Sequence, residues 1–360
     1  MKKNLKKALA SAVGVLLLTT VCLTGLAGCG SGDYTSEINV FNWGEYIDED
    51  LIDQFQEETG IKVNYNTAPT CEEMYAKMKN GGVNYDVVVP SDYMVSRMIE
   101  EDMLTPIDFN NVPNASCVDS DFLNPEYDPE GQYSMPYQWG RVAIIYNKDM
   151  VDPEDLGSWD LLWNEKYSGQ ILMFDNSRDA LGIALKRLGA SYNTEDTAVL
   201  QQAADMLIEQ KPLVQAYVMD QIFDKMESGE AAIAPYYIGD YYLMLQELEG
   251  SDVNLGFYIP EEGTNLYVDA MCIPKDTQNK AGAEAFINFM LEPEVMAQNT
   301  EYICYSTAET AARDLLPDDM KNNEDLYPSS EDIAACETYT NLPQNIRELY
   351  DSLWVEIMSS

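Results

Sequence analysis

Short apolar runs alternate with amphipathic segments along this chain, and that alternation constrains its fold more than any other feature. Runs of strand length occur at 38–41, 61–65 and 85–90. Between them, residues 49–59 and 72–80 have the apolar spacing of helices, and glycine follows each segment. Strands that alternate with helices form a mainly parallel sheet covered by helices, so we expect an α/β fold.

The alternation resumes after a loop-rich stretch at 108–137. Apolar strands at 141–146 and 268–273 are expected to cross between two groups of elements, and the chain is long enough for two domains. The further expected elements are strands at 170–174, 231–235 and 255–259, and helices at 178–188 (capped by Ser177), 195–210, 240–248, 281–291 and 346–358. The expected N-lobe comprises residues 38–141 and 268–314, and the expected C-lobe comprises 142–267 and 315–360.

Residues 1–28 have the features of a lipoprotein signal peptide. Four lysines precede an uncharged, mostly apolar stretch that ends at Leu26-Ala27-Gly28-Cys29. Small residues before the cysteine allow cleavage there, and the Cys29 thiol would then take the lipid. We expect a lipidated tether over 29–37 that anchors an extracytoplasmic protein to the cell membrane. The alternative is an uncleaved transmembrane anchor, because the stretch is about long enough to span a bilayer.

The charge of the chain is strongly negative. The full sequence carries −41, and removal of the four leader lysines leaves 17 basic and 62 acidic residues, a net charge of −45. Nucleic acid is therefore excluded as a partner, and a cationic ligand is favoured at long range. The alternative reading is that the acidity serves only the solubility of an exposed protein.

Two residue types limit the possible chemistry. Histidine is absent, which excludes Ser-His-Asp and Cys-His catalysis and histidine-ligated zinc, but not the paired-carboxylate chemistry of glycoside hydrolysis. No metal site and no cofactor are expected. Five cysteines remain after Cys22 and Cys29 are discounted, and their odd number and wide spacing favour free thiols, although a disulfide stays open.

Aromatic and acidic residues follow the predicted strands. They occur at 42–46, 91–93, 175–179, 236–240 and 267–269. Ligands of open α/β sheets sit beyond the carboxyl ends of strands, so these side chains are expected to share one cleft. Carboxylates replace the water lost by an ammonium group, while ring faces cover methylene groups and attract the cation. The pattern therefore suits a linear polyamine.

Asp92 lies at the start of a helix expected from about Met94. Its charge would offset the positive end of the helix dipole and so make the site acceptable to a cation. An ordinary helix-capping role is the alternative for this aspartate.

Several ordered motifs resemble those of the spermidine/putrescine-binding proteins over essentially the whole mature chain. They are Asn42-Trp43-x-Glu45-Tyr46, Val88-Val89-Pro90-Ser91-x-Tyr93, Met135-Pro136-Tyr137-x-Trp139-Gly140, Asp269-x-x-x-Ile273-Pro274 and Asn288-Phe289-Met290-Leu291-x-Pro293. The resemblance implies a two-lobed, Venus-flytrap α/β fold with two inter-lobe crossovers. It also implies a monomeric, non-enzymatic lipoprotein that delivers spermidine or putrescine to a cognate ABC permease.

The resemblance also implies a ligand-binding site and some departures from the family pattern. The expected site residues are Trp43, Tyr46, Ser91, Asp92, Tyr93, Asn176, Asp179, Tyr237, Tyr267, Asp269, Tyr305 and Thr340. Within this set, Asp269 is expected to bind the secondary amine. Tyr237 and Tyr267 replace tryptophans common in the family. Asn176 replaces a common aspartate, a charge that Asp92 is expected to restore. Core packing is the alternative for Trp43.

Two other functions are compatible with parts of the pattern. A surface glycoside hydrolase could use two carboxylates in an aromatic cleft. A ferric-iron-binding protein could use the adjacent tyrosines Tyr236 and Tyr237 as hard ligands. For the polyamine reading, we expect the lobes to close over the ligand by hinge motion near 141–142 and 267–268.

Overall fold

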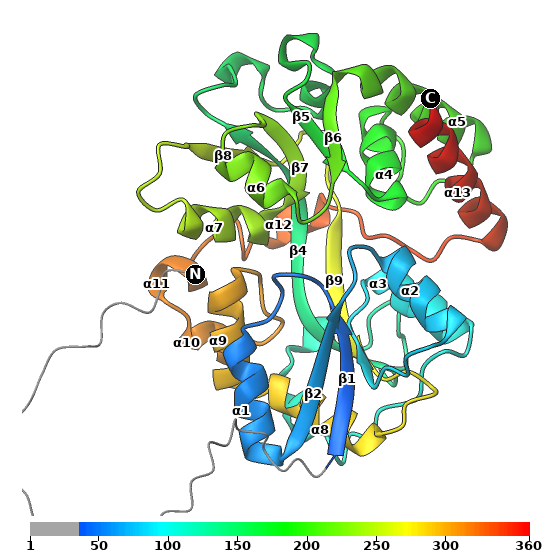
Figure 1. Ribbon diagram of the computed structural model, residues 1–360, viewed down its shortest axis with the longest axis vertical. Coiled ribbons are helices and arrows are strands. Elements are labelled where there is room, and N and C mark those ends of the chain that lie inside the picture. Colours follow the sequence, from blue (N-terminus) through cyan, green and yellow to red (C-terminus); the bar gives the residue numbers. More distant parts are fainter. Residues whose placement is uncertain (1–35) are drawn as a thin grey trace, which may run out of the picture. The chain divides into compact units, whose positions relative to one another are not determined.

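The computed structural model describes residues 36–360, so the predicted signal peptide, Cys29 and most of the tether lie outside the described residues. Helices and strands alternate through the described chain, and the strands lie in the order β2-β1-β3-β9-β4-β7-β5-β6, with β8 paired to β4. The elements form two lobes that are connected by the long strands β4 and β9, as Figure 1 shows.

The N-lobe is built on a short parallel sheet. Its strands are β1 (Ser36–Asn42), β2 (Ile61–Thr67) and β3 (Val87–Val88), with β1 in the centre. The helices of this lobe are α1 (Glu49–Thr59), α2 (Cys71–Asn80), α3 (Asp92–Glu100), α8 (Lys280–Met290), α9 (Pro293–Ile303) and α10 (Thr310–Leu315). In Figure 1, α1 lies on one side of β1 and β2, and α2 and α3 lie on the other. The carboxyl ends of β1 and β2 point toward the junction of the lobes.

The crossing strands form an antiparallel pair. β4 (Ser134–Asn147) pairs with β9 (Leu266–Cys272) from Ser134 to Arg141 and then with β7 and β8 in the C-lobe. In this ladder Gly140 is opposite Tyr267. A Cβ at Gly140 would lie 2.6 Å from the Tyr267 hydroxyl, so glycine is required there for the tyrosine to lie across the ladder.

The C-lobe carries the other strands, β5 (Ile171–Phe174), β6 (Val214–Val218), β7 (Ile233–Tyr237) and β8 (Leu255–Tyr258). Its helices are α4 (Ser177–Arg187), α5 (Thr197–Gln210), α6 (Ile222–Glu227), α7 (Ile238–Glu247) and α13 (Gln344–Ser359), and the short helices α11 (Asp318–Lys321) and α12 (Ser330–Ala334) precede α13. Elsewhere along the described chain, short 3-10 helices occur at Pro113–Cys117, Ser120–Phe122, Pro153–Asp155, Trp159–Trp163, Glu165–Tyr167 and Lys211–Leu213.

Most predicted elements occur within a few residues of their expected limits, and the differences have local causes. β4 begins at Ser134 rather than 141, because the loop-rich segment joins the ladder with β9 seven residues earlier. The cap of α4 is Asn176 and not Ser177, since the Asn176 side chain accepts the amide hydrogens of Arg178 and Asp179. β6, α6 and the helices α9 to α12 were not anticipated from the sequence.

The core of each lobe is apolar, with Phe41, Phe55, Trp159 and Phe174 fully buried. The five cysteines of the described chain are free thiols, and Cys71, Cys272 and Cys304 are buried. Between residues 36 and 360, no helix combines the length and the apolar character needed to cross a bilayer.

Candidate functional site

A cavity lies where the two lobes meet, and aromatic rings form much of its wall. Its lining residues are Trp43, Gly44, Tyr46, Ala68, Pro69, Thr70, Cys71, Ser91, Tyr93, Asn176, Asp179, Met219, Asp220, Phe223, Tyr236, Tyr237, Asp240, Asn265, Tyr267, Asp269, Tyr305 and Tyr339.

The topology explains why residues so distant in sequence share one cavity. Trp43 follows β1, and Ser91 follows β3 at the start of α3. From the C-lobe, Asp179 lies in the first turn of α4, directly after β5, and Asp240 lies in the first turn of α7, directly after β7. The carboxyl ends of strands from both lobes thus meet at one place, as is usual for ligand sites in open α/β sheets.

Asp269 lies on the crossing strand β9 and is 5% exposed. Its Oδ2 accepts a hydrogen bond from the Tyr46 hydroxyl at 2.7 Å, and its Oδ1 accepts one from Ser91 Oγ at 2.6 Å. Burial raises the pKa of Asp269 to about 6, although these two donors act in the opposite direction. The carboxylate is thus oriented by neutral donors alone.

Asp179 is oriented in the same way from the other lobe. Its Oδ1 accepts from the Tyr339 hydroxyl at 2.9 Å, and its Oδ2 accepts from Asn176 Nδ2 at 2.7 Å and the Tyr237 hydroxyl at 3.2 Å. Burial raises the pKa of Asp179 to about 6 against the effect of the Tyr339 and Tyr237 hydroxyls. Asn176 therefore serves both as the cap of α4 and as a support for the carboxylate.

A third buried carboxylate belongs to Asp240. Its Oδ2 accepts from the Tyr305 hydroxyl at 2.8 Å, and a Cβ at Gly239 would overlap the Tyr305 ring. Burial, together with the nearby acids Asp220 and Glu45, raises the pKa of Asp240 to about 8. This part of the cavity is therefore the most unfavourable for an uncompensated negative charge.

The rings in the cavity pack mainly edge to face. Ring centroids of Tyr46 and Tyr305 are 4.7 Å apart, and those of Tyr237 and Tyr267 are 5.1 Å apart. Three polar atoms of the wall are buried without a hydrogen-bond partner among residues 36–360, namely Trp43 Nε1, Asn265 Oδ1 and the Tyr267 hydroxyl. An unsatisfied buried polar atom costs about 1–3 kcal/mol, so a hydrogen-bonding ligand would remove part of this penalty.

The three carboxylates share one chemical property. Within residues 36–360, no lysine or arginine nitrogen lies within 4.0 Å of Asp179, Asp240 or Asp269. Buried charges in proteins are normally paired, so these acids are arranged for a cation from outside the chain. Among the same residues, no group of histidine, cysteine and acidic side chains is arranged to hold a metal ion.

Ten of the twelve residues proposed from the sequence line the cavity, and Asp92 and Thr340 do not. Asp92 is the first residue of α3, whose N-cap is Ser91, and it does not line the cavity. Its Oδ1 accepts the Tyr93 amide hydrogen at 2.6 Å. That Asp92 restores a charge to the site stays a prediction.

Thr340 does not line the cavity, but its neighbour Tyr339 does. The amide of Thr340 donates to Asn193 Oδ1, and its carbonyl oxygen accepts from Arg178 Nη2. A ligand-binding role of Thr340 stays a prediction.

Sequence reasoning also missed Asp240, Asn265 and Tyr339 as wall residues. Asp240 ends the aromatic and acidic run 236–240, so its position after a strand was a usable signal. No local pattern marks Asn265 or Tyr339, because their places depend on how distant segments pack.

Comparisons with known proteins identify the family. The model for bacterial extracellular solute-binding proteins matches residues 50–328. The spermidine/putrescine-binding periplasmic protein of Escherichia coli (strain K12) is 38% identical over 320 residues, which cover 88% of this chain and 90% of that protein. A candidate spermidine/putrescine ABC transporter structure from Listeria monocytogenes has a TM-score of 0.85 and 40% identity, and the match covers 89% of this chain and 98% of that chain.

The Tp0655 (TpPotD) lipoprotein of Treponema pallidum is also similar, with a TM-score of 0.78 and 28% identity over 89% of this chain and 99% of that chain. These structures confirm the predicted α/β periplasmic-binding-protein fold. The comparisons give no support to the glycoside hydrolase or the ferric-iron-binding alternative. The chain belongs to the bacterial extracellular solute-binding protein family and acts as a binding protein rather than an enzyme.

Proposed function

We propose that this protein binds a linear polyamine, spermidine or putrescine, outside the cytoplasm and delivers it to an ABC importer. The observation that carries the proposal is the set of three buried carboxylates, Asp179, Asp240 and Asp269, which line one aromatic cavity and form no ion pair with a lysine or arginine among residues 36–360. The names of the relatives from Escherichia coli and Listeria monocytogenes support the same ligand class.

Each part of a polyamine has a counterpart in the wall. The ammonium groups would bind the carboxylates and take hydrogen-bond acceptors such as Asn265 Oδ1 in place of water. The rings of Trp43, Tyr237 and Tyr267 would cover the methylene groups and add cation–π attraction of about 0.5–2 kcal/mol per good contact. Three carboxylates match a triamine better than a diamine, so we expect spermidine to bind more tightly than putrescine.

Binding is proposed to involve motion of one lobe relative to the other. β4 and β9 connect the lobes, and their residues 140–141 and 266–267 are paired directly. Hinges near Arg141–Val142 and Tyr267–Val268 would therefore lie side by side in the ladder, so both strands could bend together. We assign residues 38–141 and 268–314 to the N-lobe and 142–267 and 315–360 to the C-lobe for this motion.

We further propose that Cys29 carries a lipid that tethers a monomer to the cell membrane beside its permease. The sequence Leu26-Ala27-Gly28-Cys29 after an apolar stretch supports lipidation. The similarity to the Treponema pallidum lipoprotein supports it too. Mass spectrometry of the protein extracted from membranes should detect a diacylglycerol-modified cysteine at the mature N-terminus, and an unmodified Cys29 would contradict this part of the proposal.

Titration calorimetry tests the ligand class. The mature protein is titrated with putrescine, cadaverine, spermidine, spermine, betaine and an oligosaccharide. We expect tight binding of at least one polyamine, with no binding of betaine or the sugar. Failure of every polyamine to bind would overturn the proposal, and turnover of the oligosaccharide or visible absorption on addition of ferric iron would point to the other two functions.

A further inference from the structure

The segment 337–347, which we call the strap, leads from near the end of α12 into the first turn of α13. Its first part is bound to the C-lobe. The Glu337 carboxylate accepts from Lys186 Nζ at 2.5 Å and from the Tyr192 amide at 3.2 Å. Further along, the Thr340 amide donates to Asn193 Oδ1 at 2.9 Å. The strap must therefore move with the C-lobe.

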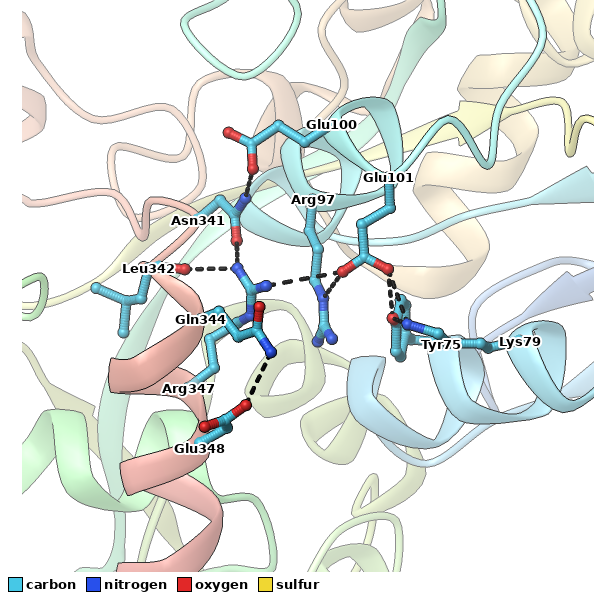
Figure 2. A network of polar contacts seen from close by, with 10 residues as sticks. All are labelled: Tyr75, Lys79, Arg97, Glu100, Glu101, Asn341, Leu342, Gln344, Arg347 and Glu348. Carbon is cyan, nitrogen blue, oxygen red and sulfur yellow. Dashed lines mark hydrogen bonds and ion pairs between the residues drawn. The ribbon is translucent and has the colours of Figure 1, made fainter.

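The second part of the strap reaches the N-lobe, where it meets the end of α3 (Figure 2). Asn341 Nδ2 donates to Glu100 Oε2 at 2.6 Å, and Arg347 Nη2 lies 3.7 Å from Glu101 Oε1. Arg347 also fixes the strap itself, because its Nη1 donates to Asn341 Oδ1 at 2.8 Å and to the Leu342 carbonyl oxygen at 2.6 Å. These two inter-lobe contacts, Asn341–Glu100 and Arg347–Glu101, are called the latch below.

The N-lobe side of the latch is held in place by contacts within the N-lobe. Glu101 accepts from the Tyr75 hydroxyl at 2.5 Å, from Lys79 Nζ at 3.0 Å and from Arg97 Nε at 3.0 Å, as Figure 2 shows. The Arg97 guanidinium also lies 3.7 Å from the centre of the Tyr75 ring. Arg347 therefore approaches a carboxylate that α2 and α3 already orient.

The latch and the cavity share two elements. α3 carries Tyr93 in its first turn and Glu100 at its last residue, and the strap carries Tyr339 two residues before Asn341. Tyr93 and Tyr339 both line the cavity, and their rings meet edge to face at 5.8 Å between centroids. Tyr339 in turn donates to Asp179. Separation of the lobes would thus break the latch and open the wall between Tyr93 and Tyr339 in one motion.

We propose that Arg347 and Asn341 are positioning residues that hold the closed form and limit the rate at which bound polyamine leaves. The ligand in this inference rests on the proposed function, while the latch itself does not. Arg347 and Glu101 are partly exposed, with 24% and 27% of their side chains accessible, so the latch is weak and reversible. A weak latch slows release without preventing delivery to a permease.

The test compares dissociation rates measured by stopped-flow displacement of spermidine. The double variant Arg347→Met/Asn341→Ala should release spermidine about fivefold faster, with an unchanged association rate. Arg347→Lys should restore part of the slow release, because it keeps the charge near Glu101. The matched control is Arg187→Met, which removes an arginine–aspartate pair with Asp160 that lies within the C-lobe, and it should leave the rate unchanged.

A second measurement needs no ligand. Small-angle scattering of the ligand-free double variant should give a larger radius of gyration than the wild type, and high salt should reduce the difference by screening the wild-type pair. Glu100→Gln probes the latch from the N-lobe and covers the case in which the strap variant does not fold. Unchanged release rates together with unchanged scattering would overturn the latch. Absence of spermidine binding by the wild type would instead overturn the proposed ligand, and the scattering comparison would still decide on the latch.

Discussion

The cavity and the latch both contain acidic side chains, but the pKa values of these acids are shifted in opposite directions. In the cavity, burial raises the pKa of Asp179 and Asp269 to about 6 and that of Asp240 to about 8. At the latch, burial also raises the pKa of Glu101, but hydrogen bonds from Tyr75, Arg97 and Lys79 outweigh it and lower the pKa to about 2.

The difference lies in the donors. Tyrosine, serine and asparagine groups orient the cavity carboxylates without neutralising them, whereas lysine and arginine neutralise Glu101. A carboxylate that the protein leaves unpaired in a buried site is available to a cationic ligand. Of the two acidic regions compared, only the cavity, whose carboxylates form no ion pair with a lysine or arginine among residues 36–360, is therefore suited to bind a cation.

The largest expected effect is that of Asp269→Asn on ligand affinity at the cavity. The asparagine amide oxygen can still accept from one of the two hydroxyls, Tyr46 or Ser91, but the charge is lost, so spermidine binding should weaken about 100-fold, or ~2.7 kcal/mol. The matched control is Asp92→Asn, a buried aspartate outside the cavity, which should change affinity by less than about twofold. Calorimetry that found equal effects for the two variants would remove Asp269 from the site.

The pH dependence of binding should show a smaller effect. A bound cation favours the ionised carboxylates and lowers their pKa, so binding releases protons and affinity falls as the pH drops through about 8 and then 6. We expect about one proton released at pH 7, mainly from Asp240, and affinity about tenfold weaker for each unit by which the pH falls between 8 and 6. Calorimetry in two buffers of different ionisation enthalpy measures the proton release, and a value of zero would contradict the unpaired state of Asp240.

In the ligand-free protein, the charges of the two regions should affect the stability of the fold in opposite directions. The pKa of Asp240 is higher in the folded than in the unfolded state, so its ionisation destabilises the fold as the pH rises toward 8. The pKa of Glu101 is lower in the folded state, so its charge stabilises the fold above about pH 4.5 and loses that effect as the pH falls toward 2. At pH 8, Asp240→Asn should therefore raise Tm and Glu101→Gln should lower it, each by about 2–4 °C for about 1 kcal/mol. Shifts of the same sign in thermal melts would remove the distinction.

The smallest effect is expected from Tyr339→Phe. The ring stays against Tyr93, but Asp179 loses one of its three hydrogen-bond donors. Spermidine affinity should fall about threefold, or ~0.7 kcal/mol, within the usual range for one hydrogen bond. The comparison variant is Tyr192→Phe, whose ring also packs on Tyr339 but outside the cavity wall; if both variants weaken binding equally, packing rather than the hydrogen bond to Asp179 is responsible.

The sequence by itself determined the class of fold and the family. Apolar period and strand–helix alternation predicted most elements of both lobes, since these patterns reflect local geometry and burial. The run after each strand identified Trp43, Ser91 and Asp179 as wall residues, because strand ends of an open α/β sheet face the ligand cleft.

Only the tertiary structure decided which of two acids in similar local positions faces the cavity. Asp92 and Asp240 both lie in the first turn of a helix that follows a strand, yet Asp240 lines the cavity and Asp92 does not. A rotation of about 100° per residue separates the two outcomes, and the packing of each helix on its sheet sets that rotation. The positions of Tyr339 and of the latch also depend on packing. They come from contacts between segments more than 150 residues apart, such as Tyr339 with Asp179 and Asn341 with Glu100, so the sequence alone does not predict them.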